Sequence, residues 1–200
     1  PWGYHFTNII IHIAAVFTAF LLLSLKYDKK KVFVLSVLFA CHPAVTQAVV
    51  WIPGRNDSLL ALFILLSFYF LVKFFDNKEK KYILFHFVFF ALSLLTKETA
   101  VIAPFFYVVF ILYKNNLTIK TKENKFFITF WIFAVLLYFI YRHFVLSYQT
   151  YNVTFDLLFS TFFQSLPEIT KYVSNIFFPF NLSVFPSFIK VDYLLSAASV

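Results

Sequence analysis

HPAVTQAVVWIPGRNDSLLALFILLSFYFLV, residues 42–72, sets a run of polar residues and a Pro-Gly pair directly before a long apolar segment. The segment after Ser58 has the length of a membrane helix and carries no charge as far as Val72. The rest of the chain is similar: 62% of its 200 residues are hydrophobic, 24% are aromatic, only 13% are charged and 2 are glycine. This composition lies far outside that of soluble globular proteins and predicts a multi-pass membrane protein.

Apolar runs of helical length recur along the whole chain. A helix needs roughly 20 residues to cross the bilayer core, and the second, fourth and fifth runs are shorter than that. Short helices of this kind end below the membrane surface, which suggests that they surround a cavity. We therefore predict an all-α fold, a transmembrane bundle of about seven helices with short interfacial helices in addition. The runs lie near residues 5–25, 32–41, 58–75, 82–95, 99–113, 126–147 and 155–180.

One transmembrane domain is expected over residues 1–200, truncated at both ends. The chain opens at Pro1, contains no methionine and closes inside a further apolar run. The single cysteine, Cys41, excludes an intrachain disulfide.

Basic residues give the orientation. Each of the segments 26–31, 73–81 and 114–125 contains four of the 17 lysines and arginines. These alternate loops are predicted to be cytoplasmic by the positive-inside rule. The formal charge of +8 is thus an orientation signal, and it predicts a lipid bilayer as the partner and no nucleic acid.

Uncommon polar residues collect on the opposite, external side. His5, Asn8 and His12 are spaced to share one helical face, which either bonds a neighbouring helix or faces a substrate. Ionisable groups gathered at one membrane surface indicate a functional site. The remaining histidines lack metal-ligand spacing, so no metal site is predicted, although a divalent ion is not excluded.

Residues 43–52 are predicted to form a short interfacial helix that begins at Pro43 and is anchored by Trp51. Pro53-Gly54 then breaks it, and Asp57 or Ser58 can cap the long helix that follows. Arg55 has two interpretations. A guanidinium beside a free helix N-terminus suits a phosphate or carboxylate, whereas a local ion pair with Asp57 is purely structural.

Lys97 and Glu98 are adjacent and point about 100° apart on a helix, so they need not pair with each other. Lys97 can supply a second positive charge for an anionic ligand, and Glu98 can cap the next helix or orient that lysine. Arg142 lies near the outer end of its helix, where snorkelling to the interface is the alternative to a functional role.

Four ordered blocks carry a resemblance to a known family: YHFTNIIIH, LFACHPAVTQAVVWIPGRNDSLLALF, LSLLTKETAVIAP and YVSNIFFPFNLSV. They resemble multi-pass glycosyltransferases of the GT-C fold, in particular the transmembrane-and-TPR-containing protein O-mannosyltransferases and their prokaryotic relatives. The resemblance runs from about residue 4 to about residue 186. It implies transfer of a hexose, mannose above all, from a polyprenyl-phosphate carrier to a protein or glycan hydroxyl on the external or lumenal face.

The resemblance also implies roles for residues. Arg55 and Lys97 match the family's basic positions and are expected, with Arg142, to bind the donor phosphate. The expected supporting residues are His5, Asn8, His42, Gln47, Trp51, Asp57 and Glu98. Relatives often have Glu in place of Gln47, and an amide cannot act as a base. The family's acidic catalytic motif lies ahead of Tyr4, so the catalytic base is expected N-terminal to Pro1. No cofactor beyond the lipid-linked sugar is implied.

Two other classes compete with a transferase. A transporter or flippase of a lipid-linked or anionic substrate also uses polar residues in broken helices, but its site lies near the membrane midplane. A membrane scaffold explains the hydrophobicity and leaves Arg55 and Lys97 without a role. A transferase of this family belongs in the endoplasmic reticulum if the chain is eukaryotic and in the plasma membrane if it is prokaryotic.

Overall fold

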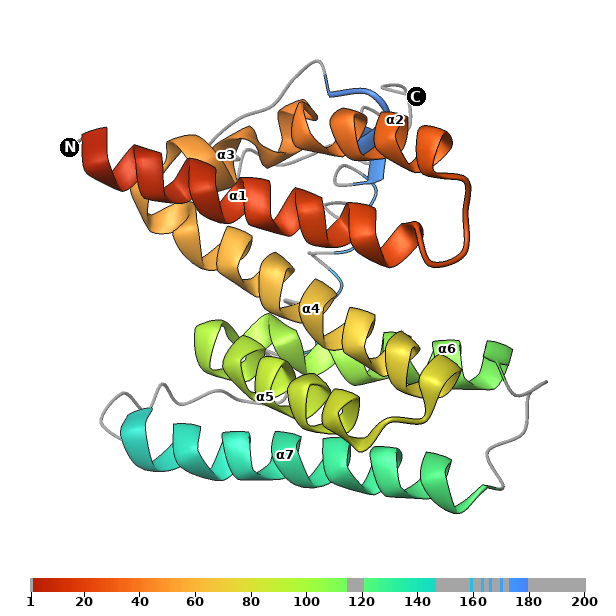
Figure 1. Ribbon diagram of the computed structural model, residues 1–200. Coiled ribbons are helices and arrows are strands. Elements are labelled where there is room, and N and C mark those ends of the chain that lie inside the picture. The colour runs from red at the N-terminus through yellow and green to blue at the C-terminus, as the bar shows by residue number, and fades with distance from the viewer. Residues whose placement is uncertain are drawn as a thin grey trace.

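The computed structural model describes residues 2–114 and 121–146, and in the C-terminal part residues 159, 163, 166, 170 and 173–179 (Figure 1). Within the described part of residues 2–146 the structure has seven α-helices, three short 3-10 helices and no strand. The all-α class is therefore confirmed. Most of the helix predicted over residues 155–180 lies outside the described residues.

The helices follow the predicted apolar runs closely. Their bounds are α1 Trp2–Leu23, α2 Lys29–Ala40, α3 Thr46–Val50, α4 Arg55–Asn77, α5 Lys80–Thr96, α6 Ala103–Lys114 and α7 Lys122–Leu146. The 3-10 helices are η1 Pro43–Val45, η2 Ile52–Gly54 and η3 Glu98–Ile102.

The helices fall into two groups by length, those long enough to span a membrane and those that are shorter. Among the described residues, three helical segments are long and apolar enough to cross a membrane: Trp2–Leu23, Ile52–Asn77 and Lys122–Val145. By contrast α2 and α6 have 12 residues each, about 18 Å at the usual rise and well short of a bilayer core of about 30 Å. With the 17 residues of α5, these are the three predicted short helices. A bend of 51° separates α2 from the segment Pro43–Val50 that follows it.

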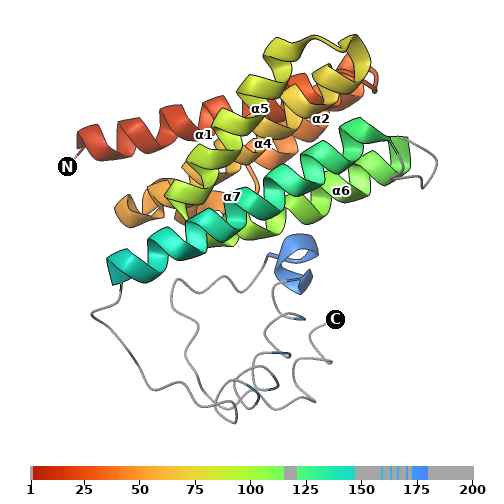
Figure 2. The ribbon, with the colours of Figure 1, turned by 90° about the horizontal axis from the view of Figure 1, so that it is seen from below.

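The core lies where α4, α5, α6 and α7 meet. Its fully buried side chains are large and mostly aromatic, among them Phe90, Tyr107, Phe127 and Trp131. In Figures 1 and 2, α4 crosses between α1 on one side and α5 on the other.

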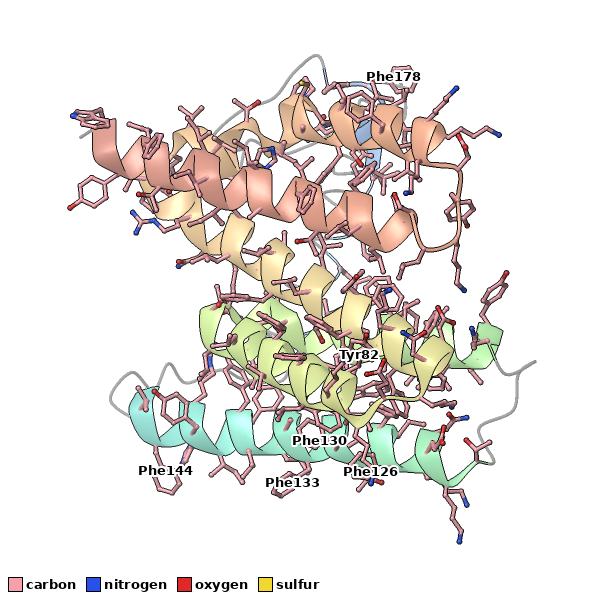
Figure 3. The ribbon with its side chains drawn as sticks, viewed as in Figure 1. Tyr82, Phe126, Phe130, Phe133, Phe144 and Phe178 are labelled. Carbon is pink, nitrogen blue, oxygen red and sulfur yellow. The ribbon has the colours of Figure 1, made fainter. Side chains whose placement is uncertain are left out.

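Large apolar side chains also cover the outside of the bundle. Phe133 and Phe144 on α7 project away from the other helices (Figure 3) and are 56% and 74% exposed. Exposed apolar surface on this scale is unfavourable in water and favourable in lipid. The chain is an integral membrane protein.

Ion pairs mark the two ends of the bundle. Lys78 pairs with Glu123 and Lys114 with Asp76, both at 2.6 Å, at the end where the basic loops gather. Lys97–Asp57 and Arg142–Glu98 lie at the other end, beside the N-terminus of α4 and the C-terminus of α7 (Figure 1). The predicted cytoplasmic and external residues therefore separate to opposite ends of the structure.

Candidate functional site

The polar turn between α2 and α4 forms an elbow, residues 41–54, at the end of the bundle opposite the basic loops, which is the predicted external end. His42 caps η1, because its Nδ1 accepts a hydrogen bond of 3.1 Å from the Ala44 N–H, with Pro43 in the first turn. Trp51 ends α3 and is 44% exposed, as expected of an interfacial anchor. The predicted helix over residues 43–52 is thus present, divided between η1 and α3.

The start of α4 differs from the prediction. The helix begins at Arg55, directly after Gly54, and has no side-chain cap. Asp57 lies inside the first turn, and Ser58 donates from Oγ to the Ala48 carbonyl at 3.3 Å. The prediction that Asp57 or Ser58 caps this helix is wrong, because the 3-10 turn of η2 leads straight into α4 and places both residues beyond the cap.

Arg55 contacts α1 through a buried amide, and of its two interpretations the ion pair with Asp57 is not formed in the structure. Its Nε donates to Oδ1 of Asn8 at 3.2 Å, and its guanidinium lies 5.6 Å from the centre of the Tyr4 ring. Among the described residues the two Nη groups of Arg55 have no hydrogen-bond partner. Arg55 is held from one side only, so these two groups are available to an anion. Tyr4 belongs to the first resemblance block, but its contact with Arg55 could not be predicted from the residue pattern.

Asn8 and His12 bond their neighbours. Asn8 is fully buried, and its Nδ2 donates to the carbonyls of Val49 at 3.1 Å and Trp51 at 3.3 Å. His12 Nε2 lies 3.1 Å from the Ala40 carbonyl at the end of α2. For these two residues the structure bears out the alternative in which the polar face of α1 bonds a neighbouring segment. His5 on the same helix is half-buried.

Lys97 and Asp57 form an ion pair between the end of α5 and the first turn of α4. Their side chains are 36% and 48% exposed, so the pair contributes little to stability and can open for a ligand. Glu98 does not orient Lys97. Instead its carboxylate accepts a hydrogen bond of 3.2 Å from Arg142 Nη1, which also donates to the Tyr138 hydroxyl at 2.9 Å.

The environment of Glu98 favours its charged form. A hydrogen bond from its own backbone N–H, and then the hydrogen bond from Arg142, hold the pKa of this carboxyl below its usual value. Arg142 therefore has defined partners, and snorkelling alone does not explain its position.

A pocket of about 230 Å³ brings Lys97 and Arg142 together. Both cations line it with Glu98, Tyr138 and Tyr141, and the remaining lining residues are Leu94, Leu95, Thr96 and Val145. Arg55 does not line this pocket. The structure thus brings together two of the three predicted phosphate ligands, while the third, Arg55, contacts α1 instead. Tyr138 and Tyr141 were not predicted as site residues, although tyrosines near an arginine at a helix end are a usable signal.

A second pocket, of about 360 Å³, lies behind the elbow. It is lined by apolar residues together with His12, Gln47, Asp57 and Ser58. Asp57 therefore borders this pocket while its partner Lys97 borders the first one. The last supporting residue, His42, lies with Nε2 2.9 Å from the Ile176 carbonyl. Within the described ranges, no three His, Cys, Asp or Glu side chains are grouped to hold a metal ion.

The described residues form an all-α membrane bundle, and the pocket with two cations at the end opposite the basic loops is its candidate site. Residues 1–141 match the family described as dolichyl-phosphate-mannose-protein mannosyltransferase. The chain belongs to this family. The match contains Arg55 and Lys97 and ends one residue before Arg142.

Curated relatives agree with the family. The chain is 42% identical over 69 residues to human protein O-mannosyl-transferase TMTC2, a match of 34% of this chain and 8% of that protein. It is 33% identical over 104 residues to Drosophila melanogaster protein O-mannosyl-transferase Tmtc1, covering 52% of this chain and 12% of that protein. These relatives are much longer than the parts that match. No solved structure matches the chain.

Proposed function

We propose that the protein is a membrane glycosyltransferase that moves mannose or a related hexose from a polyprenyl-phosphate carrier to a hydroxyl of a protein or glycan. The family match over residues 1–141 is the observation that carries this proposal, because the family's description includes both the lipid-linked donor and the protein acceptor. The position of the cations supports it. They lie at the end of the bundle opposite the basic loops, and the positive-inside rule predicts that this end faces the external or lumenal side.

The chemistry of the transfer requires positive charge where the phosphate departs. When the bond between the sugar and the phosphate breaks, the leaving phosphate gains negative charge, and fixed cations stabilise it in the transition state. Lys97 and Arg142 line one pocket, so one phosphate can contact both. The planar guanidinium of Arg142 can donate hydrogen bonds to two phosphate oxygens at once, and the ammonium of Lys97 supplies a compact positive charge.

The carboxylates beside these cations have a defined part in this proposal. Asp57 holds Lys97 and Glu98 holds Arg142, and all four side chains are between 36% and 58% exposed. They keep the cations in place before the donor binds. When the donor binds, its phosphate accepts some of the hydrogen bonds that each cation made to its carboxylate. The free energy lost is small because exposed ion pairs are weak.

Arg55 is proposed as the third phosphate ligand. It belongs to the same first turn of α4 as Asp57, and Asn8 and Tyr4 hold only its Nε and one face. Its Nη groups are left out of these contacts, and we propose that they bind the same donor headgroup. The general base that activates the acceptor hydroxyl is not assigned to any described residue and is proposed to lie ahead of Pro1.

The proposed location is the endoplasmic reticulum for a eukaryotic chain and the plasma membrane for a prokaryotic one. In both, the donor's lipid tail lies in the bilayer and its sugar at the external or lumenal surface.

The test is transfer of radiolabelled mannose from polyprenyl-phosphate mannose to an acceptor by the intact protein in membranes. We expect transfer by the intact protein and none by membranes lacking it. The competing transporter class is tested by single cysteines at positions 55 and 97, in a Cys41→Ser background. Labelling of both from the external side only agrees with a transferase. Labelling from each side in turn, without sugar transfer, would establish a transporter and reject the proposal.

A further inference from the structure

Three polar contacts join the segment around α5 to α7, and all three have nearly the same offset in sequence. Lys78 contacts Glu123, His86 contacts Trp131 and Glu98 contacts Arg142, at separations of 45, 45 and 44 residues. A constant offset indicates that two helices are parallel and keep the same register along their whole length. The first contact lies at the cytoplasmic end, the second in the core and the third beside the external pocket.

The central contact is buried. His86 and Ser67 are fully buried and Trp131 is 1% exposed. Trp131 Nε1–H donates to His86 Nε2 at 2.9 Å, and an indole nitrogen can only donate. A neutral His86 therefore carries its proton on Nδ1, which lies 2.9 Å from both the carbonyl oxygen and the hydroxyl oxygen of Ser67. One imidazole thus joins α4, α5 and α7.

His86, Ser67 and Trp131 form a hydrogen-bonded triad. Nearly the same number of residues separates each of them from a residue at the external end of its own helix. Lys97 follows His86 by 11 residues, Arg142 follows Trp131 by 11, and Asp57 precedes Ser67 by 10 on the antiparallel α4. Each interval is about three helical turns, or roughly 16 Å. A register set at the triad is therefore carried unchanged to the ends of the three helices, where Lys97 meets Asp57 and shares a pocket with Arg142.

The aromatic packing around the triad does not set the register by itself. His86 is surrounded by the rings of Tyr107, Phe127 and Trp131, and neighbouring turns present further phenylalanines. Rings of similar size can interdigitate in more than one register, whereas buried donors and acceptors are satisfied in only one. A slip of one residue between α5 and α7 moves Arg142 about 1.5 Å along the axis and turns it by about 100°.

We propose that His86 is a positioning residue. Through Ser67 and Trp131 it fixes the register of α4, α5 and α7, and so it places Lys97 and Arg142 around one donor phosphate. The role toward the donor rests on the proposed function. The role in helix register stands on the hydrogen bonds of the triad alone.

The test uses the intact protein with three changes in the triad. His86→Phe keeps a ring and removes both polar contacts, while His86→Gln can still accept from Trp131 and donate to Ser67. Trp131→Phe removes the indole donor from the other side. Phe90→Leu, one turn along α5, is the control for a loosened core, since Phe90 is fully buried but not part of the triad.

Two quantities are measured. Spin labels at Leu95→Cys and Phe144→Cys, in a Cys41→Ser background, report the distance between the external ends of α5 and α7. KM for polyprenyl-phosphate mannose and kcat are measured on unlabelled protein at matched folded amounts. We expect a single narrow distance for wild type, His86→Gln and Phe90→Leu, and a shifted or broadened one for His86→Phe and Trp131→Phe.

For the kinetics we expect His86→Phe and Trp131→Phe to raise KM for the donor about tenfold, and His86→Gln to stay within about twofold of wild type. A wild-type distance in His86→Phe, or an equal rise of KM in Phe90→Leu, would overturn the proposal. If His86→Phe does not accumulate, Trp131→Phe carries the test. If wild type transfers no sugar, the proposed function fails, and the distances alone decide whether His86 sets the register.

Discussion

Asn8 shows how one side chain can hold the external end together. It lies on α1, yet its amide donates to two carbonyls of the elbow and accepts from Arg55 on α4. A buried amide with all these bonds made is stable, and each bond lost leaves a buried polar group unsatisfied. The sequence placed Asn8 and Arg55 on the same side of the membrane. It could not pair them, since they lie 47 residues apart.

Replacement of Asn8 by Leu should therefore destabilise the protein. We expect the free energy of unfolding to fall by about 1–3 kcal/mol, because the Val49 and Trp51 carbonyls lose their donor. Thermal unfolding in detergent measures this, with Asn56→Ala as the control on an exposed amide. Equal melting of Asn8→Leu and the control would contradict this role of Asn8.

Gly54 is required for space and not for backbone freedom. A Cβ atom at this position would lie 2.7 Å from the Gln47 carbonyl oxygen and 3.0 Å from Ala48 Cα. Both are backbone atoms of α3 that cannot move aside easily. The same addition at Gly3 meets nothing within 4 Å.

Gly54→Ala should lower the free energy of unfolding by about 1–3 kcal/mol through overpacking. Gly3→Ala should leave stability unchanged or raise it slightly, since it removes backbone freedom from the unfolded chain. Thermal unfolding in detergent, with the melting temperatures of the two variants and wild type compared, tests this prediction. If both melt like wild type, α3 does not pack against Gly54 as described.

The short helices and the elbow together shape the candidate site. Hydrophobic runs predicted six helices of the described part correctly, because apolar length is the dominant signal in a membrane chain. The exact start of α4 was not predicted. Pro53-Gly54 is typical of a helix break, but in the structure η2 continues directly into α4. His86 was missed as well. A single ionisable residue in the middle of an apolar run was the available signal.

The contact between η3 and α7 should depend on pH. The pKa of Glu98 is lowered in the folded protein, so its contribution to stability is present at neutral pH and is lost as the pH falls through that lowered pKa, below 4.5. Glu98→Gln should melt below wild type at pH 7, and the gap should close as the pH falls through the lowered pKa of Glu98. Thermal unfolding across this range checks the sign. A gap that widens toward acid pH would contradict the role of the Arg142 contact.

The whole molecule has one basic end and one end with the candidate site. Counting lysines predicted this division, because charge placement in loops follows the membrane and not the details of packing. The pairing of Lys97 with Asp57 and of Arg142 with Glu98 could not be predicted in the same way. It depends on which helices are neighbours and in what register, and periodicity carries no such information.

Labelling of single cysteines tests this division directly. In a Cys41→Ser background, Asn56→Cys at the start of α4 should react with a membrane-impermeant maleimide in intact cells or sealed lumen-out vesicles. Asn77→Cys at the other end of α4 should react only after permeabilisation. Both positions are exposed in the structure. The reverse pattern would place the site on the cytoplasmic face.

The central claim is that the external cations bind the donor phosphate, and sugar transfer by matched variants tests it most directly. The intact protein is compared with Arg55→Ala, Lys97→Ala and Arg142→Ala, at equal amounts in membranes, using radiolabelled polyprenyl-phosphate mannose. Lys114→Ala is the control, because it removes an equivalent ion pair at the cytoplasmic end. We expect transfer to fall about a hundredfold in the three external variants and to stay near wild type in the control. Transfer at the wild-type rate in Lys97→Ala and Arg142→Ala would show that the pocket does not hold the phosphate.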